Sequence, residues 1–313
     1  MSKIKVYRFL SNLPSFSCPV LTIGTFDGVH LGHQKIIKRI REIADEQEGE
    51  TLLLTFHPHP KFVLHPDDYN LKLINTLDER IELLEQYGID NLLIGSFTDE
   101  FSQLEPENYL RNFIMEKIKP TNIVIGFDHR FGKGRKGDIG LMKKMAPELD
   151  YKIEEIPVEQ INDIKISSTK IREAIAAGNI QEANKLSGHP FTLSGQVITG
   201  NQVGIQIGFP TANIFVENKR KLIPGIGIYA VFVHYRGKRY KGMLYIGFRP
   251  TFSGTEKTIE VNIFDLNANL YGETLGIDFI AKTRDDVRFN SREALVKQLE
   301  QDKIDTLAVL DQG

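Results

Sequence analysis

Two histidines spaced three residues apart form the strongest chemical signal in the sequence. His30 and His33 close the segment Gly24–His33, GTFDGVHLGH, at the junction between an apolar run and an amphipathic stretch. A helix N-terminus offers free backbone N–H groups and a partial positive charge, so it favours phosphate. Two imidazoles there could stabilise charge that develops on a phosphorus atom during transfer. The alternative is a helix start at which glycine and histidine have no catalytic role.

Ser168, Thr169 and Arg172 form a second candidate phosphate site. They lie in the segment ISSTKIR, residues 166–172, where we predict that a helix begins at Ser168 and Thr169. Arg172 then follows one turn later on a similar face of the helix. Hydroxyl groups, backbone N–H groups and a guanidinium fork together suit phosphate oxygens. The alternative is an ordinary N-cap, which Ser and Thr also favour.

The first half of the chain alternates apolar runs with amphipathic stretches, which predicts a parallel sheet covered by helices on both faces. Ligands of such sheets bind beyond the carboxyl ends of the strands. The predicted strands are Val20–Gly24, Thr51–Phe56, Asn91–Ile94, Asn122–Ile125 and Ile153–Val158, and the predicted helices are Gln34–Ala44, Asp78–Tyr87 and Glu107–Lys117.

The rhythm changes near Leu186–Pro190, after which short strands separated by turn signals predict a small antiparallel barrel. A final helix is predicted over Ser291–Asp302, with Asn290 and Glu293 at capping-box spacing. The predicted strands are Gly195–Thr199, Ile228–His234, Tyr240–Ile246, Thr258–Phe264 and Ile277–Arg284.

Length and composition predict two domains of a cytoplasmic protein. The chain has 313 residues, 41% of them hydrophobic and 26% charged, with a formal net charge of -2. That charge argues against a nucleic-acid partner. The single cysteine, Cys18, excludes an intramolecular disulfide and a Cys-rich metal cluster. No apolar run approaches the roughly 20 residues of a membrane span, so we expect no membrane partner. Oligomeric state is not predicted.

The complete segment Gly24–His33 closely resembles the H-x-G-H turn of the nucleotidyltransferases, and G-x-F-D-G-x-H-x-G-H resembles their FAD synthetase branch. Further matches follow in order: Phe56–Pro60 resembles F-x-P-H-P, Gly126–Gly132 resembles G-x-D-F-x-F-G, and residues 167–172 resemble S-S-T-x-I-R. His129 departs from the pattern, since the family usually has phenylalanine there.

This resemblance implies an FMN adenylyltransferase that joins the AMP unit of ATP to FMN and releases pyrophosphate. His30 and His33 would stabilise the transition state, and Mg²⁺ is expected to bridge the phosphates. The implied ATP-binding residues are Gly24, Phe26, Asp27, Gly32, Asp128, Ser168, Thr169 and Arg172, and the implied flavin-binding residues are His57, Pro58 and Phe131.

The second half resembles riboflavin kinase along most of its length. Residues 208–213, GFPTAN, resemble the family motif in which Thr211 and Asn213 would bind Mg²⁺, and Gly200, Gly204 and Gly208 resemble its nucleotide loop. Glu260 lies in TIEV, at the family's position for the base that takes a proton from the ribityl hydroxyl. Without the resemblance, P-T-A-N is a turn and Glu260 is a solvent-facing strand residue.

Three residues depart from the kinase pattern. Ile205 replaces the usual arginine of the glycine-rich loop, Tyr245 stands where asparagine is usual, and Asn262 replaces a histidine. The loss of an arginine removes a charge and a bidentate fork near phosphate. Two interpretations therefore stay open: an active kinase, or a degenerate kinase domain that binds flavin or regulates.

We therefore predict an α/β protein with two domains. Residues 1–186 would form a Rossmann-like FMN adenylyltransferase domain, and residues 187–313 a riboflavin-kinase-like antiparallel barrel with a C-terminal helix. The expected substrates are ATP, FMN and riboflavin.

Overall fold

The structure is a computed structural model of the chain, and it describes residues 3–8, 12–68, 70–157, 166–200, 204, 207–251 and 254–312. Contacts divide the chain into two compact units. The first unit comprises residues 1–71 and 80–167, and the second comprises residues 72–79 and 168–313. The predicted domain boundary at residue 186 stays a prediction.

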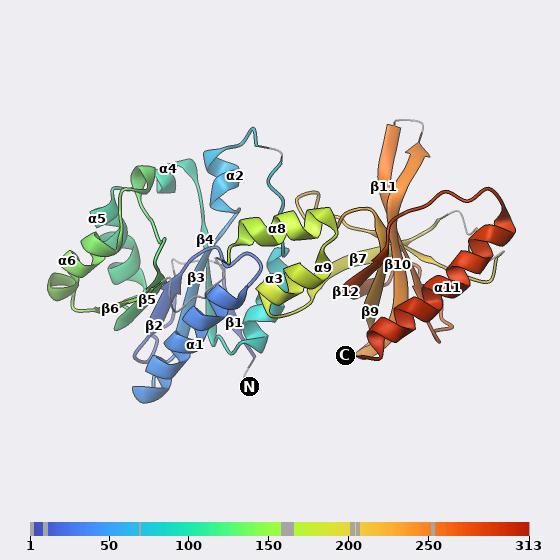
Figure 1. The fold of residues 1–313 in the computed structure, drawn as a ribbon. Coiled ribbons are helices and arrows are strands. Elements are labelled where there is room, and N and C mark those ends of the chain that lie inside the picture. Colours follow the sequence, from blue (N-terminus) through green and yellow to red (C-terminus); the bar gives the residue numbers. More distant parts are fainter. Residues whose placement is uncertain are drawn as a thin grey trace. The chain divides into compact units, whose positions relative to one another are not determined.

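The first unit contains a six-stranded sheet in which every pair of neighbouring strands is parallel, in the order β1-β4-β3-β2-β5-β6 (Figure 1). The central strands are mostly apolar and almost entirely buried, as expected for strands covered on both faces. The fold class predicted for this half is therefore confirmed. The strands are β1 Lys5–Tyr7, β2 Val20–Ile23, β3 Thr51–His57, β4 Asn91–Ser96, β5 Asn122–Gly126 and β6 Lys152–Ile156.

The helices of this unit include several that the periodicity did not predict. The predicted helix over residues 107–117 is divided into a short α-helix and a π-helical stretch, and α6 was not predicted at all. The helices are α1 Leu31–Glu46, α2 Pro60–Leu64, α3 Leu77–Gln86, α4 Asp99–Ser102, α5 Pro106–Asn108, the π-helical stretch Tyr109–Met115, a 3₁₀ turn Lys133–Arg135 and α6 Ile139–Leu149.

The strand order places a topological switch point between β2 and β5. The chain leaves β2 toward β3 and β4 on one side, then returns to β5 on the other side of β2. Ligands of open parallel sheets bind at such a point, beyond the carboxyl ends of the two strands. The loops that follow β2 and β5 carry Gly24–His33 and the segment after Gly126, so both motifs lie at this point.

The second unit is a closed antiparallel barrel with the strand order β10-β11-β8-β7-β12-β9. The predicted barrel is confirmed, although β8, which contains the A-N of P-T-A-N, was not predicted as a strand. The strands are β7 Phe191–Ile198, β8 Ala212–Phe215, β9 Gly227–Tyr235, β10 Lys238–Thr251, β11 Gly254–Ile263 and β12 Thr274–Arg284.

Helices α8 Ser168–Ala177, α9 Ile180–Ser187 and α11 Arg292–Leu310 accompany the barrel. The predicted cap of the last helix is wrong by one residue. Ser291 is its N-cap, and its hydroxyl accepts a hydrogen bond from the Ala294 backbone N–H. The helix also continues beyond Asp302, whose carboxylate forms a bidentate pair with Arg284 at 2.6 and 2.7 Å.

Residues 72–79 join the second unit through a buried ion pair. Lys221 Nζ lies 2.5 Å from Glu79 Oε2 and also donates to the carbonyls of Ile74 and Thr192, each at 2.6 Å. Glu79 Oε1 in turn accepts the Ser194 backbone N–H at 3.0 Å. These bonds compensate for the burial of both charges. Among the described residues, no helix has the combination of length and apolar content that a membrane span requires.

Candidate active sites

The first candidate site is built on the turn between β2 and α1. Three of its residues adopt left-handed backbone conformations: Phe26 with φ 48°, Gly28 with φ 88° and Val29 with φ 35°. This conformation is strained for bulky and β-branched residues, and such strain is found at functional sites. Phe26 and Val29 are both buried. Packing therefore holds the turn in a conformation that its sequence alone would not favour.

His30 is the N-cap of α1, and its side chain determines where the helix begins. Its Nδ1 accepts a hydrogen bond from the His33 backbone N–H at 3.3 Å. A neutral imidazole that accepts at Nδ1 carries its proton at Nε2. The rings of His30 and His33 stack, with centroids 3.6 Å apart and an angle of 13° between their planes. The structure thus brings the two predicted catalytic histidines into direct contact.

His33 lies in surroundings that disfavour a positive charge. Burial lowers the pKa of His33 well below its usual value, and the neighbouring His30 and Arg80 act in the same direction. The Phe26 ring packs 4.6 Å from the His33 ring. Within the part of the chain that the structure describes, the buried Nδ1 of His33 has no hydrogen-bond partner. His33 is therefore neutral at pH 7.

The other residues predicted for ATP in this turn are close to the histidine pair. Gly24 lies against the Phe26 ring, since a Cβ atom there would be 3.0 Å from it. Asp27 and Gly32 are both buried. The Asp27 carboxylate acts electrostatically on Arg80 and raises its pKa, against the larger effect of burial, which lowers it. The turn is therefore a compact arrangement of charged and aromatic groups.

The loop after β5 presents one predicted residue and buries another. Asp128 is exposed, and Gly126 lies beside it at the end of β5. Phe131 is buried in the hydrophobic core of the first unit. The role of Phe131 in flavin binding stays a prediction, and this packing leaves little of its ring exposed. His129 is largely buried, and burial, aided by Arg135, lowers its pKa to about 4.

His57 and His59, at and just after the end of β3, lie in different environments. His57 and Pro58, both predicted to bind flavin, are exposed at the carboxyl edge of the sheet. The peptide bond between them is cis. His59 is buried at the N-cap of α2, where its Nδ1 accepts the Lys61 backbone N–H at 3.2 Å. His59 therefore has a structural function, and His57 and Pro58 are accessible to a ligand.

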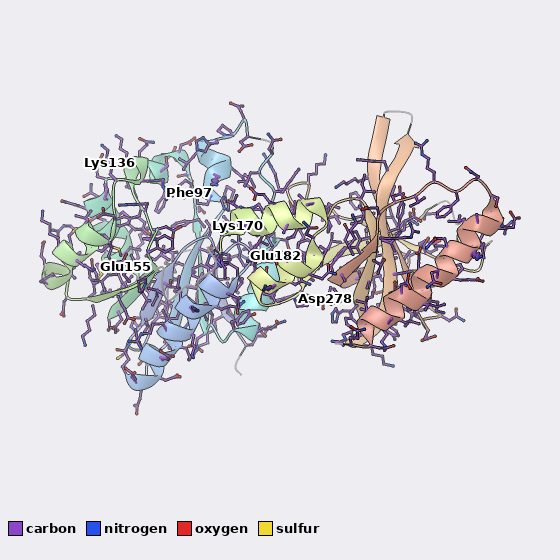
Figure 2. All side chains as sticks on the ribbon, in the orientation of Figure 1. Phe97, Lys136, Glu155, Lys170, Glu182 and Asp278 are labelled. Carbon is purple, nitrogen blue, oxygen red and sulfur yellow. The ribbon has the colours of Figure 1, made fainter. Side chains whose placement is uncertain are left out.

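Sequence reasoning missed an aromatic cluster that includes Phe131. Ring centroids lie 5.2 Å apart for Tyr109 and Phe131, 5.9 Å for Phe101 and Tyr109, and 5.7 Å for Phe97 and Phe101. Phe56, the penultimate residue of β3, contacts Phe97 at 5.6 Å. Figure 2 labels Phe97, which directly follows β4. These rings come from separate segments, so no spacing in the sequence could have revealed the cluster.

The predicted helix start at residue 168 is confirmed, because α8 begins at Ser168. Thr169 is exposed, and Ser168 and Arg172 are partly buried. Arg172 Nε donates to the Lys72 carbonyl at 2.8 Å, which fixes the direction of its guanidinium group. These three residues belong to the second unit, and the histidine pair belongs to the first.

The second candidate site lies where β8 and β11 pair. Glu260 is directly opposite Asn213 in the register of the two strands, so their side chains share a face. The Thr211 hydroxyl donates to Glu260 Oε2 at 3.1 Å. The three residues predicted as metal ligands and base thus converge from segments about 50 residues apart in the chain.

Gly200 of the predicted nucleotide loop lies against the Asn213 side chain of this group. A Cβ atom at Gly200 would overlap the side-chain amide of Asn213, so a larger residue there would displace that amide. The Gly204 carbonyl accepts the Phe209 backbone N–H at 2.9 Å, and Gly208 has a left-handed φ of 81°. Ile205, where the family usually has arginine, lies outside the described residues.

Two departures from the kinase pattern adjoin Glu260. Tyr245 is opposite Glu260 in the register of β10 and β11, and its hydroxyl donates to Asp286 at 3.2 Å. Asn262 is buried, and its Nδ2 donates to the Pro210 carbonyl at 2.6 Å. Asn262 therefore anchors the turn that precedes Thr211.

A cavity of about 610 Å³ opens beside this turn. It is open to solvent, and its walls combine backbone groups, apolar side chains and a few charged groups. The lining includes residues 208–210, residues 262–267, Glu300 and Lys303.

The second site offers oxygen ligands and no preformed metal cluster. Among the residues described here, no group of three or more His, Cys, Asp or Glu side chains could hold a metal ion. Thr211, Asn213 and Glu260 contribute a hydroxyl, an amide and a carboxylate. Mg²⁺ prefers oxygen ligands and is usually shared between few protein groups and substrate phosphates. The residues present therefore fit Mg²⁺ that arrives with a nucleotide.

Comparison with known proteins gives matches over both halves. A family model for FAD synthetase matches residues 15–170, and one for riboflavin kinase matches residues 187–310. The bifunctional riboflavin kinase/FMN adenylyltransferase of Listeria monocytogenes serovar 1/2a is 40% identical over 92% of this chain and 91% of its own length. The Bacillus subtilis protein of the same name is 39% identical over 91% of this chain and 90% of its own.

Among solved structures, the chain is similar to one described as a macrolide-efflux protein from Streptococcus pneumoniae. The TM-score is 0.87 and the sequence identity 32%, with 97% of this chain and 99% of that chain covered. This likeness extends over both units.

Proposed function

This chain belongs to the bifunctional riboflavin kinase/FMN adenylyltransferase family, and from that premise we propose which residues carry out each reaction. The enzyme uses ATP to phosphorylate riboflavin to FMN, and it transfers the adenylyl group of ATP to FMN to give FAD. One observation carries the assignment of residues: the same chain holds the stacked pair His30 and His33 and the group of Thr211, Asn213 and Glu260.

Adenylyl transfer is assigned to the turn between β2 and α1. A phosphate oxygen of FMN attacks the α-phosphorus of ATP, and the bond from that phosphorus to the β-bridging oxygen breaks, so that pyrophosphate leaves. Neither histidine has to move a proton. His30 would donate from Nε2 to the phosphoryl oxygens as their charge rises, because its Nδ1 already accepts a bond from His33. The neighbouring N-terminus of α1 would add its partial positive charge.

The remaining contacts of this reaction are proposed from side-chain type and exposure. Ser168, Thr169 and Arg172 would bind the β and γ phosphates, because two hydroxyls begin α8 and a guanidinium group follows one turn later. His57 and Pro58 would contact flavin, because they are exposed at the carboxyl edge of the sheet. The aromatic cluster that contains Phe131 would form the apolar wall beneath them.

Riboflavin phosphorylation is assigned to the barrel. Glu260 takes the proton from the ribityl hydroxyl as its oxygen attacks the γ-phosphorus of ATP, and ADP leaves. The hydrogen bond from Thr211 orients the Glu260 carboxylate. Thr211 and Asn213 would hold Mg²⁺, which supplies positive charge to the phosphate oxygens. The cavity beside Pro210 and Asn262 would receive the nucleotide.

The experiment that tests these assignments supplies riboflavin and Mg²⁺-ATP and separates FMN from FAD by chromatography. The parent enzyme should form FMN and then FAD. His30→Ala should stop at FMN, whereas Glu260→Gln should form no FMN from riboflavin but should still convert supplied FMN into FAD. If the parent enzyme made no FMN even at high Mg²⁺-ATP, the chain would be an FAD synthetase whose kinase domain is degenerate. An active His30→Ala variant would exclude the proposed adenylyl-transfer site.

A further inference from the structure

Arg80 is a buried arginine that contacts the turn bearing the histidine pair. It lies in α3, is 4% exposed, and its Nη1 donates to the Thr25 carbonyl. Thr25 is the second residue of the turn after β2. Neither the spacing of motifs nor the periodicity of α3 distinguishes Arg80 from the other charged residues of that helix. Its contact with the turn is visible only in the tertiary structure.

The Thr25 carbonyl is held from two different elements. Besides the Arg80 guanidinium, the hydroxyl of Thr55 in β3 donates to it at 3.3 Å, and Thr55 is fully buried. The next residue, Phe26, is the first of the turn with a left-handed φ. The two donors thus fix the peptide group at which the strained part of the turn begins. A guanidinium donor is the stronger of the two because it is charged.

Charge links Arg80 to the same group of residues. Asp27 raises the pKa of Arg80 through its negative charge. His30 and Arg80 both lower the pKa of His33. Burial lowers the pKa of His33 most, followed by His30 and then Arg80. A positive charge at residue 80 therefore helps to keep the His33 imidazole neutral beside His30.

We infer that Arg80 is a positioning residue for adenylyl transfer, whose bond to the Thr25 carbonyl fixes the turn that stacks His30 on His33. The inference rests on the proposed function of the two histidines. Arg80 acts through the turn and not on the substrate. Its loss should therefore slow turnover more than it weakens substrate binding.

The test measures FAD formation from FMN and ATP by Arg80→Met and Arg80→Lys. Misplacement of catalytic groups by about 1 Å can cost about 100-fold in rate, so Arg80→Met should lower kcat by about 10- to 100-fold, with KM for FMN within about threefold. Arg80→Lys should recover part of the loss, since an ammonium group can still donate to Thr25. Riboflavin phosphorylation by the same preparations should stay at the parent rate, because that site lies in the second unit.

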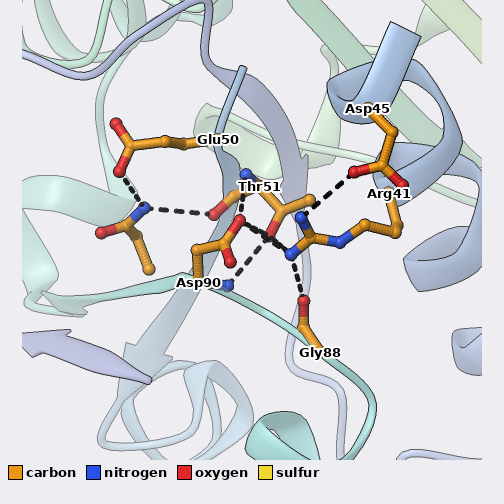
Figure 3. Close-up of polar contacts among 7 residues, drawn as sticks. Arg41, Asp45, Glu50, Thr51, Gly88 and Asp90 are labelled. Atoms are coloured by element: carbon orange, nitrogen blue, oxygen red, sulfur yellow. Dashed lines mark hydrogen bonds and ion pairs between the residues drawn. The ribbon is translucent and has the colours of Figure 1, made fainter. Parts of the chain in front are cut away.

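Arg41 offers a matched control in the same unit. Figure 3 shows its guanidinium bound to Asp90, Thr51 and the Gly88 carbonyl, with Nη2 2.7 Å from Asp90 Oδ2. This network lies at the amino ends of β3 and β4, away from the turn. Arg41→Met should therefore destabilise the unit without changing kcat for FAD formation at a temperature where it is folded.

The pH profile supplies a readout that a purely structural residue would not alter. Removal of the positive charge raises the pKa of His33, so, as the pH is lowered, FAD formation by Arg80→Met should begin to fall at a higher pH than in the parent. Arg80→Lys should keep the parent profile. Should Arg80→Met fail to fold, Thr55→Val removes the weaker donor and should give a smaller loss of kcat with the parent profile.

Two results would overturn the inference: parent-like turnover and pH profile in Arg80→Met, or an equal loss of kcat in Arg41→Met. If Arg80→Met does not fold, parent-like kcat in Thr55→Val overturns it instead. The variant His30→Ala separates this failure from that of the proposed function. An inactive His30→Ala with a fully active Arg80→Met refutes only the positioning role, whereas an active His30→Ala refutes the site itself.

Discussion

Replacement of His129 by phenylalanine should remove a pH-dependent loss of stability from the first unit. His129 follows β5, and its backbone N–H donates to the Gly126 carbonyl at 3.1 Å. Its ring lies 5.8 Å from the Phe131 ring, and its buried Nε2 has no hydrogen-bond partner among the described residues. Burial is the main reason that its pKa falls from 6.5 to about 4, and Arg135 adds to this.

The sign and magnitude follow from proton linkage. The unfolded chain protonates His129 near pH 6.5, but the folded chain does so only near pH 4, so the unfolded state gains protons first as the pH falls. Above pH 6.5, His129 therefore does not lower the free energy of unfolding. As the pH falls from 6.5 to 4, the free energy of unfolding decreases progressively. At about 1.4 kcal/mol per pH unit, the full loss is about 3.4 kcal/mol, of which about 2 kcal/mol is lost at about pH 5.

The assay is urea unfolding followed by circular dichroism at about pH 5 and about pH 8, from which the free energy of unfolding is obtained for parent and variant. The free energy of unfolding of His129→Phe minus that of the parent should be larger at about pH 5 than at about pH 8. The expected increase is about 2 kcal/mol. His65→Gln, at an exposed histidine of the same unit, serves as the matched control and should behave like the parent. If the difference between His129→Phe and the parent is the same at both pH values, the argument from burial is wrong.

Other variants should separate the two reactions from stability. His30→Ala and His33→Ala should each slow FAD formation by about 100- to 1000-fold and leave FMN formation intact, which product separation would show; near-parent rates would contradict the role of the stacked pair. Glu260→Gln should abolish riboflavin phosphorylation but not FAD formation from FMN, and retained kinase turnover would exclude Glu260 as the base. Lys221→Met should cost about 3 to 5 kcal/mol in the unfolding of the second unit, because Glu79 stays buried without its partner. The double variant with Glu79→Gln should recover part of that loss, and an equally unstable double variant would count against a paired-charge explanation.

The motifs that we propose for adenylyl transfer could be located from the sequence because their geometry is local. His30 and His33 meet because a three-residue spacing at the start of a helix brings both to one turn, where His30 caps the helix. The start of α8 at Ser168 was predicted for the same reason, from capping chemistry within a few residues. The alternation of apolar and amphipathic segments likewise predicted the parallel sheet. Local rules alone misplaced the cap of α11, where Ser291 and Asn290 are both good N-cap residues.

Contacts between residues far apart in the chain could not be predicted, because they depend on how the elements pack. The bond from Thr211 to Glu260 joins residues 49 apart, and the proximity of Arg80 to Thr25 spans 55 residues. Local periodicity predicts that a strand or helix forms but not which element it packs against. It could not reveal that Phe131 is buried in the core.

The sequence predicted both reactions through motifs that resemble two families, and matches to both family models over the two halves agree with that prediction. The position of residues 72–79 could not be predicted in the same way. These residues belong to the second unit, where Glu79 pairs with the buried ammonium group of Lys221. The physical reason is that burial of a charge requires a partner, and a partner 142 residues away is determined by the fold and not by the local sequence.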